Sequence, residues 1–177
     1  NFLKSFLIYF IISQNDNNLQ ELMSIFQIES EDIIERIFEH LLAYESKPKD
    51  KELAATLYRE LHSLKGAIRM VGFNNIQTII HKIEDIFDQI NHSNVILDSE
   101  KFIVITRSIE IVEKYLQESI ANQREILGEE YNSTISALEY IYEVELSSNN
   151  ESNDLIQNLL SIAETETNIN IIENSFS

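Results

Sequence analysis

His62 is the residue whose type and neighbours could most directly carry chemistry. On a helix, Lys65 and Gly66 would follow it by one turn, at i+3 and i+4. A neutral imidazole nitrogen is nucleophilic near neutral pH, and the phosphoramidate that it forms gives the phosphoryl group up readily. Lys65 would supply a cation for that group. A mid-helix glycine costs roughly 1 kcal/mol relative to alanine, so Gly66 indicates that another molecule must approach closely there.

The helix expected at residues 51–70 must turn His62 outward. At about 100° of rotation per residue, its large apolar side chains fall within one arc of roughly 80°. His62 lies roughly 140° from the centre of that arc. The apolar side chains of this core face are Leu53, Leu57, Leu61, Leu64, Ile68 and Val71. The pattern therefore predicts an exposed histidine on a helix that otherwise packs through leucines.

A second set of polar residues belongs to the next expected helix. His81, Glu84 and Asp88 stand at i, i+3 and i+7 and so share a face. Glu84 is at the flank of the apolar stripe, roughly 100° from its centre. If the two helices pack antiparallel, that flank can reach His62. A carboxylate that accepts the Nδ1 proton of His62 would fix the tautomer and leave Nε2 free to attack.

The elements that must position these residues are long helices. Hydrophobic residues make up 44% of the chain, with only three glycines and one proline, so turns are scarce. Apolar residues from Leu19 to Leu41 recur at helical spacing, and Pro48 and Asp50 separate this helix from the next, with Asp50 as N-cap. Four further helices are expected, at residues 51–70, 74–90, 99–123 and 130–146. The first of these ends near Gly72 and the third is closed by Gly128, while residues 91–94 form a polar loop. Short links favour an all-α, up-and-down antiparallel bundle of four helices plus a fifth.

The domain organisation follows from these elements. Residues 1–16 form an N-terminal extension that is possibly helical, residues 17–146 the helical domain, and residues 147–177 an acidic linker or tail with a possible short helix at 155–163. The first residue is not Met, and no small-residue cleavage site follows the apolar stretch at 2–12, which favours a piece of a longer protein over a secretory signal.

Charge and composition restrict the partners. The net charge is −17, which argues against nucleic acid and anionic membranes as partners, and the longest apolar run, at 6–12, is too short to span a bilayer. Cysteine is absent, which excludes disulfides and thiolate metal sites and is compatible with a cytoplasmic location. Six of the 13 basic residues nevertheless lie in the segment from Lys47 to Arg69, which contains His62: Lys47, Lys49, Lys51, Arg59, Lys65 and Arg69. Such a positive face would suit an acidic phosphoacceptor site.

Three segments together resemble a known family. They are the Arg59–Ala67 segment RELHSLKGA, Val71-Gly72-Phe73, and the His81–Asp85 segment HKIED. Their order and spacing resemble the pattern H-S-[LI]-K-G, G-F and H-x-x-E of the histidine phosphotransfer (HPt) domain that begins chemotaxis-type, CheA-like histidine kinases. Leu22–Phe26 and Glu29–Asp32 fit the opening of that domain, so the resemblance covers about residues 19–146. Ile68 departs from the small residues usual there, but it belongs to the predicted core face.

The resemblance implies a role for each matching residue. His62 would be phosphorylated, Glu84 would hold its Nδ1 side, and Lys65 and His81 would neighbour the phosphoryl group. Partner contacts would come from Gly66, Ser63, Arg59 and Arg69. In the family this domain is a substrate: a histidine kinase catalytic domain, in cis or in trans, phosphorylates it, and an aspartate of a response-regulator receiver domain removes the group. The domain would be monomeric, without metal or cofactor, and ATP and Mg²⁺ would belong to its partners.

Three alternatives remain open at this level. The domain could be a free-standing HPt relay protein rather than part of a kinase. His81-x-x-Glu84 also occurs in carboxylate-bridged di-iron bundles, but those need inward carboxylates on two pairs of helices, and the core stripes here are aliphatic. A purely structural bundle would require the cluster around His62 to be accidental. His40 and His92 are interpreted as ordinary surface residues.

Overall fold

A computed structural model describes residues 17–93 and 96–146, and the predictions for residues 1–16 and 147–177 lie outside this part. It contains α2 (Asn17–Ser46), α3 (Lys51–Met70), α4 (Asn74–His92), α5 (Ser99–Asn122), α6 (Tyr131–Tyr140) and a π-helical turn, η1 (Ile141–Leu146). No strand occurs among the described residues, which confirms the all-α prediction. No helix in this part is long and apolar enough to cross a membrane.

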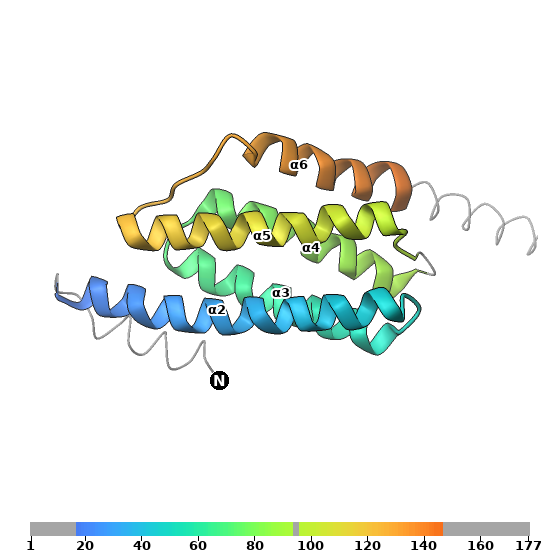
Figure 1. Ribbon diagram of the computed structural model, residues 1–177, viewed down its shortest axis with the longest axis horizontal. Helices are drawn as coiled ribbons and strands as arrows, with labels where there is room; N and C mark the ends of the chain where they lie inside the picture. The colour runs from blue at the N-terminus through green and yellow to red at the C-terminus, as the bar shows by residue number, and fades with distance from the viewer. Residues whose placement is uncertain (1–16, 94–95, 147–177) are drawn as a thin grey trace, which may run out of the picture.

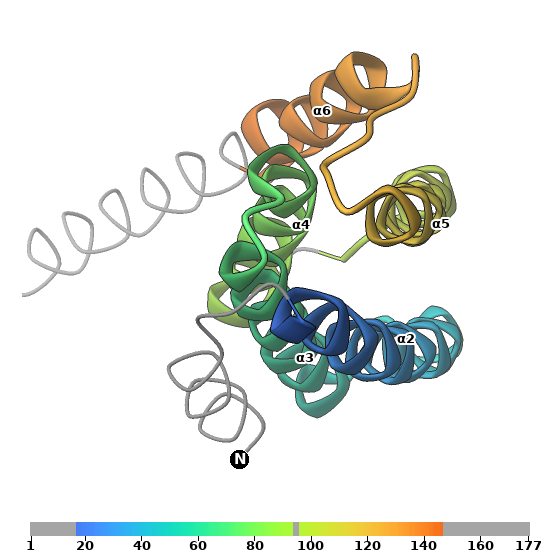
Figure 2. The same ribbon diagram turned by 90° about the vertical axis from the view of Figure 1, so that its left-hand side faces the viewer.

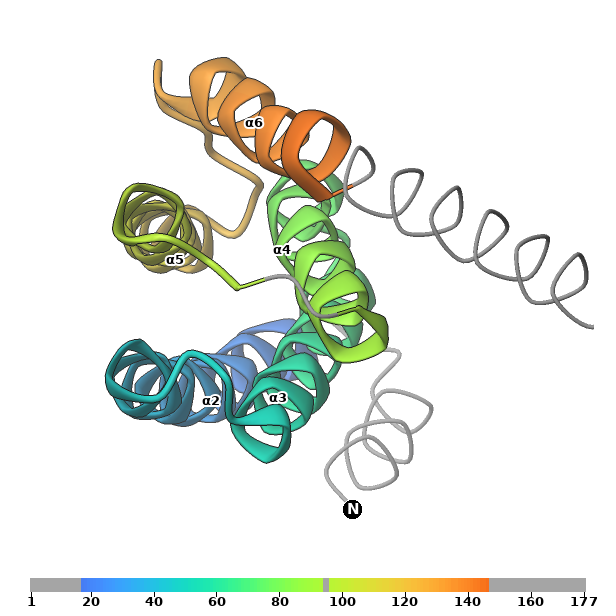
Figure 3. The ribbon, with the colours of Figure 1, turned by 90° about the vertical axis from the view of Figure 1, so that its right-hand side faces the viewer.

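Four helices surround one core. α2 packs on α3, α3 on α4, and α5 closes the ring by contacting both α2 and α4 (Figure 1). The end-on views in Figures 2 and 3 show these four helices around a common axis, with α6 outside the ring against α4 and α5. Phe26, Ile37, Leu61, Ile83 and Ile109 are each at most 1% exposed. The predicted helical bundle of four helices plus a fifth is therefore confirmed.

The sequence of α3 explains both its ends and its buried face. The Asp50 carboxylate accepts hydrogen bonds from the backbone N–H groups of Glu52 (3.0 Å) and Leu53 (3.1 Å), as an N-cap does. At the other end Gly72 has a φ of +82°, a left-handed conformation that glycine adopts without strain. The predicted core face is buried between these ends, although Leu53 and Val71 are only partly covered.

The termini of α4 depend on residues far away in the sequence. The Glu125 carboxylate accepts hydrogen bonds from the backbone N–H groups of Asn75 (2.6 Å) and Ile76 (2.9 Å), and so caps the helix N-terminus. At the C-terminus the Lys51 ammonium donates to the carbonyls of Ile90 and Ser93. The helix therefore continues to His92, and the prediction of a loop beginning at residue 91 was wrong.

The link from α5 to α6 also differs from prediction. α5 ends at Asn122, and Gln123 adopts the left-handed conformation (φ +53°), so Gly128 does not close this helix. A Cβ at Gly128 would lie 3.1 Å from Tyr115 Cε1, so this glycine permits close approach of the backbone to that ring. The expected helix at 130–146 is α6 followed by η1.

Candidate functional site

A hydrogen bond joins His62 on α3 to Glu84 on α4. The His62 Nδ1 atom lies 2.8 Å from Glu84 Oε1. The side chain of His62 is 60% exposed, whereas that of Glu84 is 5% exposed. An ionised carboxylate can only accept, so Nδ1 carries a proton, and in the neutral ring Nε2 then has the lone pair. The contact thus combines an accessible nucleophilic nitrogen with a buried acceptor that fixes the tautomer.

Lys65 balances the buried charge of Glu84. Its Nζ atom lies 2.5 Å from Glu84 Oε2, although the two groups are not aligned for a hydrogen bond. The Lys65 side chain is 21% exposed and reaches from the same helix as His62. A buried carboxylate without a cation would be costly, so this ion pair offsets the cost of burying the Glu84 side chain. The sequence predicted Lys65 beside a phosphoryl group, whereas in this structure its ammonium contacts the residue that orients His62.

The Tyr58 ring supports the histidine from the other direction along α3. It stacks on the imidazole with ring centroids 6.2 Å apart and planes inclined by 25°. Tyr58 is half-buried against the core, so it restricts where the His62 ring can swing. Sequence reasoning did not single out Tyr58. The four-residue spacing between Tyr58 and His62 could have predicted this contact, because side chains at i and i+4 of one helix lie side by side.

His81 lies apart from this hydrogen-bonded group. Its Nε2 atom is 3.5 Å from Asp85 Oδ1, one turn further along α4, and both side chains are about half exposed. Burial raises the pKa of Asp85, and the nearby charge of Glu84 raises it further, while His81, Lys65 and Lys82 oppose that shift. The structure therefore places His81 on the helix of Glu84 but gives it a partner of its own.

The residues predicted to contact partners lie along α3 around His62. Arg59 and Arg69 are exposed, and Gly66 is half-exposed. Arg59 Nη2 donates to Thr56 Oγ1 (2.9 Å), and the Ser63 hydroxyl donates to the Arg59 carbonyl (2.9 Å). Both are contacts within one helix, which leave the charge of Arg59 facing solvent. The exposed side of α3 thus presents two guanidinium groups, one on each side of His62.

The other two histidines differ from each other. His92 is exposed, and its Nδ1–H donates to the Asp88 carbonyl (2.8 Å) in the last turn of α4. His40 is only half-exposed, and its Nδ1 is buried without a hydrogen-bond partner, so the surface interpretation fits it less well. Within residues 17–93 and 96–146, no three histidine, aspartate or glutamate side chains are grouped so that they could hold a metal ion.

Comparison with known proteins places the chain in a family. The Hpt domain family model matches residues 21–126. The sensor histidine kinase CheAY of Helicobacter pylori is 26% identical over 100 residues, which are 56% of this chain and 12% of that protein. The chemotaxis protein CheA of Halobacterium salinarum is 27% identical over 100 residues, 56% of this chain and 15% of the relative. The chain therefore spans only a small part of the length of the curated relatives that it matches.

Solved structures share the fold. The phosphorylated P1 domain of CheA3 in complex with CheY6 from R. sphaeroides gives a TM-score of 0.64 at 18% identity, covering 70% of this chain and 96% of that one. The solution structure of the histidine phosphotransfer domain of CheA gives 0.63 at 22% identity, covering 69% and 92%. The family model matches more than half of the chain, and the fold agrees with these domains. The chain belongs to the Hpt domain family, the histidine phosphotransfer domains.

Proposed function

We propose that His62 accepts a phosphoryl group from the catalytic domain of a histidine kinase and passes it to an aspartate of a response-regulator receiver domain. The contact between His62 Nδ1 and Glu84 Oε1 at 2.8 Å carries this proposal. It presents Nε2 as a lone-pair nucleophile on an exposed ring. The similarity of the chain to a sensor histidine kinase and to a chemotaxis protein supports the same relay.

The proposed transfer consists of two steps at the imidazole of His62. The Nε2 lone pair attacks the γ-phosphorus of ATP held by the kinase, an N–P bond forms, and the bridging P–O bond breaks to release ADP. The ring becomes a phosphorylated imidazolium, whose charge the Glu84 carboxylate stabilises through Nδ1–H. A receiver carboxylate then attacks the phosphorus, the N–P bond breaks, and its electron pair returns to Nε2. The residue ends as the neutral tautomer with which it began, and no proton needs to leave.

The exposed side of α3 supplies the surface for both partners. Arg59 and Arg69 lie on either side of His62 and offer positive charge to an acidic receiver site. Gly66 and Ser63 are small residues beside the ring, where the partner's backbone can approach. Lys65 and His81 are proposed to meet the phosphoryl group once it is attached, Lys65 by turning from Glu84. In the R. sphaeroides structure, a phosphorylated P1 domain is in complex with CheY6.

We further propose that the parent protein is a chemotaxis-type histidine kinase located in the cytoplasm. The relatives that the chain matches support this assignment. The similarity covers 12–15% of their length, so in those relatives the matching segment is one part of a much longer protein. ATP and Mg²⁺ would then bind to the kinase and receiver domains rather than to this bundle. The free-standing relay protein is the alternative, and the sequence of the complete gene distinguishes the two.

Phosphorylation of matched histidine variants tests the proposal. The purified domain is incubated with the catalytic domain of its own kinase and radiolabelled ATP, and separately with phosphoramidate, a small donor that needs no protein partner. Wild type and His92→Gln, whose histidine lies outside the site, are expected to acquire acid-labile, base-stable phosphate, and His62→Gln to acquire none. Helix content by circular dichroism serves as the folding control. Equal labelling of His62→Gln, or no labelling of folded wild type by either donor, would show that the proposal is wrong.

A further inference from the structure

A pocket of about 280 Å³ opens at the end of the bundle where α3 begins, outside the site around His62. Asp50 and Lys51 at its rim precede His62 by about a dozen residues, or roughly 18 Å at 1.5 Å per residue. Its apolar lining consists of Pro48 in the link between α2 and α3, Ala54 of α3, Ile90 of α4 and Ile96 in the segment before α5. The volume is near the lower end of ligand pockets, roughly 300 Å³, and suits a single substituted ring.

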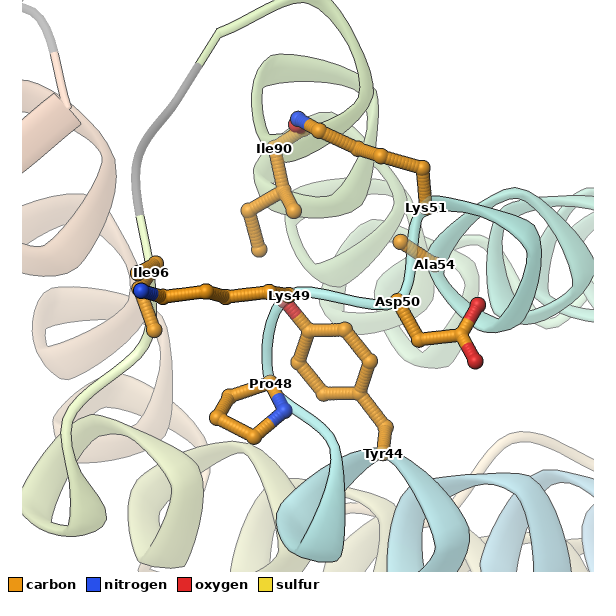
Figure 4. A pocket seen from close by; sticks show the side chains of 8 residues that line it. All are labelled: Tyr44, Pro48, Lys49, Asp50, Lys51, Ala54, Ile90 and Ile96. Atoms are coloured by element: carbon orange, nitrogen blue, oxygen red, sulfur yellow. The ribbon is translucent and has the colours of Figure 1, made fainter.

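Tyr44 supplies an unsatisfied polar group to this pocket. The residue is 1% exposed, and its hydroxyl has no hydrogen-bond partner. Its ring is fixed edge-on against Phe87, with centroids 5.8 Å apart and an interplanar angle of 73°. Figure 4 shows the hydroxyl end of the ring directed toward the base of the Lys49 side chain, which also lines the pocket. Burial raises the pKa of this phenol, so at neutral pH it remains an O–H donor. Buried hydroxyls are normally hydrogen-bonded, and an unpaired one therefore indicates a missing acceptor.

The charged groups around the pocket leave one cation for a ligand. The Lys51 ammonium is bound to the carbonyls of Ile90 and Ser93, and the Asp50 carboxylate caps α3 and points away from the pocket (Figure 4). Lys49 extends across the opening toward Ile96 (Figure 4). Among the described residues its ammonium forms no ion pair. The pocket therefore combines an apolar wall, a buried hydroxyl donor and an accessible positive charge.

We infer that this pocket binds a small, largely apolar carboxylic acid with an aryl group. The ring of the ligand packs against Ala54, Ile90 and Ile96, and its carboxylate accepts the Tyr44 hydroxyl proton and pairs with Lys49. This arrangement satisfies the buried hydroxyl and places negative charge beside the ammonium. The site is distinct from the proposed phosphoryl-accepting site, and its test does not depend on phosphorylation.

Titration with 3-phenylpropionate and its neutral analogue 3-phenylpropionamide tests the inference. Amide signals of Tyr44, Ala54 and Ile96 are followed by nuclear magnetic resonance on the full chain. The acid is expected to bind saturably with a millimolar Kd, as suits a probe of this size, and more tightly than the amide. His62→Gln is expected to bind it like wild type, which separates this site from the relay. Absence of saturable shifts, or equal binding of acid and amide, would overturn the inference.

Two substitutions assign the contacts. Tyr44→Phe keeps the ring and removes a hydroxyl that has no partner in the protein, so the variant should fold. Its affinity for 3-phenylpropionate should fall about fivefold, as expected for the loss of one hydrogen bond. Lys49→Met should abolish the preference for acid over amide. Tyr140→Phe and Lys47→Met, both at exposed positions, are the matched controls. Unchanged affinity in either test variant, or equal losses in the controls, would contradict the proposed contacts.

Discussion

Two histidine–carboxylate pairs of this chain use the same functional groups in different surroundings. His62 and Glu84 come from two helices, with their atoms 2.8 Å apart and a carboxylate only 5% exposed. His81 and Asp85 belong to one helix, 3.5 Å apart, and both are about half exposed. The first pair joins an exposed ring to a buried acceptor, while in the second water competes for both partners. Exposed ion pairs contribute little to the free energy of unfolding because solvent screens their charges. Burial of the carboxylate, rather than the pairing itself, therefore distinguishes His62, whose ring is held in one orientation, from the solvated His81.

Removing the charge of Glu84 should produce the largest difference between the pairs. Glu84→Gln still offers an acceptor to Nδ1–H, but it cannot stabilise the imidazolium formed on phosphorylation. We expect phosphorylation of His62 to slow by about 10- to 100-fold, as when the group that orients a reactive histidine is lost. Asp85→Asn, the control, should stay within about twofold by the weak coupling of exposed pairs. Rates of phosphate incorporation measure both. If the two variants slow equally, the distinction between the pairs is wrong.

Stability should distinguish the lysine beside the buried Glu84 from a lysine in an exposed ion pair. Lys65→Met leaves the buried Glu84 carboxylate without its ion-pair partner, and we expect a loss of about 2 kcal/mol, below the range for fully buried pairs because Lys65 is partly exposed. The control is Lys82→Met, whose partner Glu139 is 46% exposed, with an expected loss below about 0.5 kcal/mol. Urea unfolding gives both free energies. Adding Glu84→Gln to Lys65→Met should recover part of the loss, and an additive double variant would argue against the ion pair.

The sequence predicted the parts of the site that depend on helical period. The leucine stripe of α3 placed His62 outward, and the flank position of Glu84 placed it within reach across an antiparallel pair. The period could not predict which atom Lys65 contacts, because its four-carbon stem can reach either the solvent side of His62 or the buried carboxylate. That choice depends on how deeply Glu84 is buried, which packing alone determines.

Long-range contacts bind both ends of α4, and they account for the wrong prediction of its C-terminal end. Local signals at residues 91–94 are those of a loop, but the Lys51 ammonium binds the carbonyls of Ile90 and Ser93 from 39 and 42 residues away. Glu125 caps the start of α4 from a similar separation, 50 residues from Asn75. Side chains that bind helix ends from other elements stabilise a further part-turn, and no window of neighbouring sequence contains them.

The smallest expected effect is a pH dependence that belongs to Asp85. Its raised pKa means that the folded protein holds this proton more tightly than the unfolded chain. That contribution to stability is complete below the ordinary pKa of 3.8 and is lost as the pH rises through the folded pKa. Asp85→Asn removes the loss, so the melting temperature of this variant should gain on that of wild type as the pH rises above the ordinary pKa of the carboxyl group. The gain should reach only about 1 °C, because solvent screens this half-exposed group.

Asp88→Asn is the matched control for this measurement, because Asp88 makes the same i,i+4 contact with His92 at 3.5 Å. Melting curves of wild type and both variants from acidic to neutral pH give the comparison. If Asp85 and Asp88 variants gain equally, the effect is the general relief of negative charge in a chain of net charge −17. If Asp85→Asn gains alone, partial burial beside Glu84 is the cause. In that case the second pair is intermediate between a surface contact and the buried arrangement of His62 and Glu84.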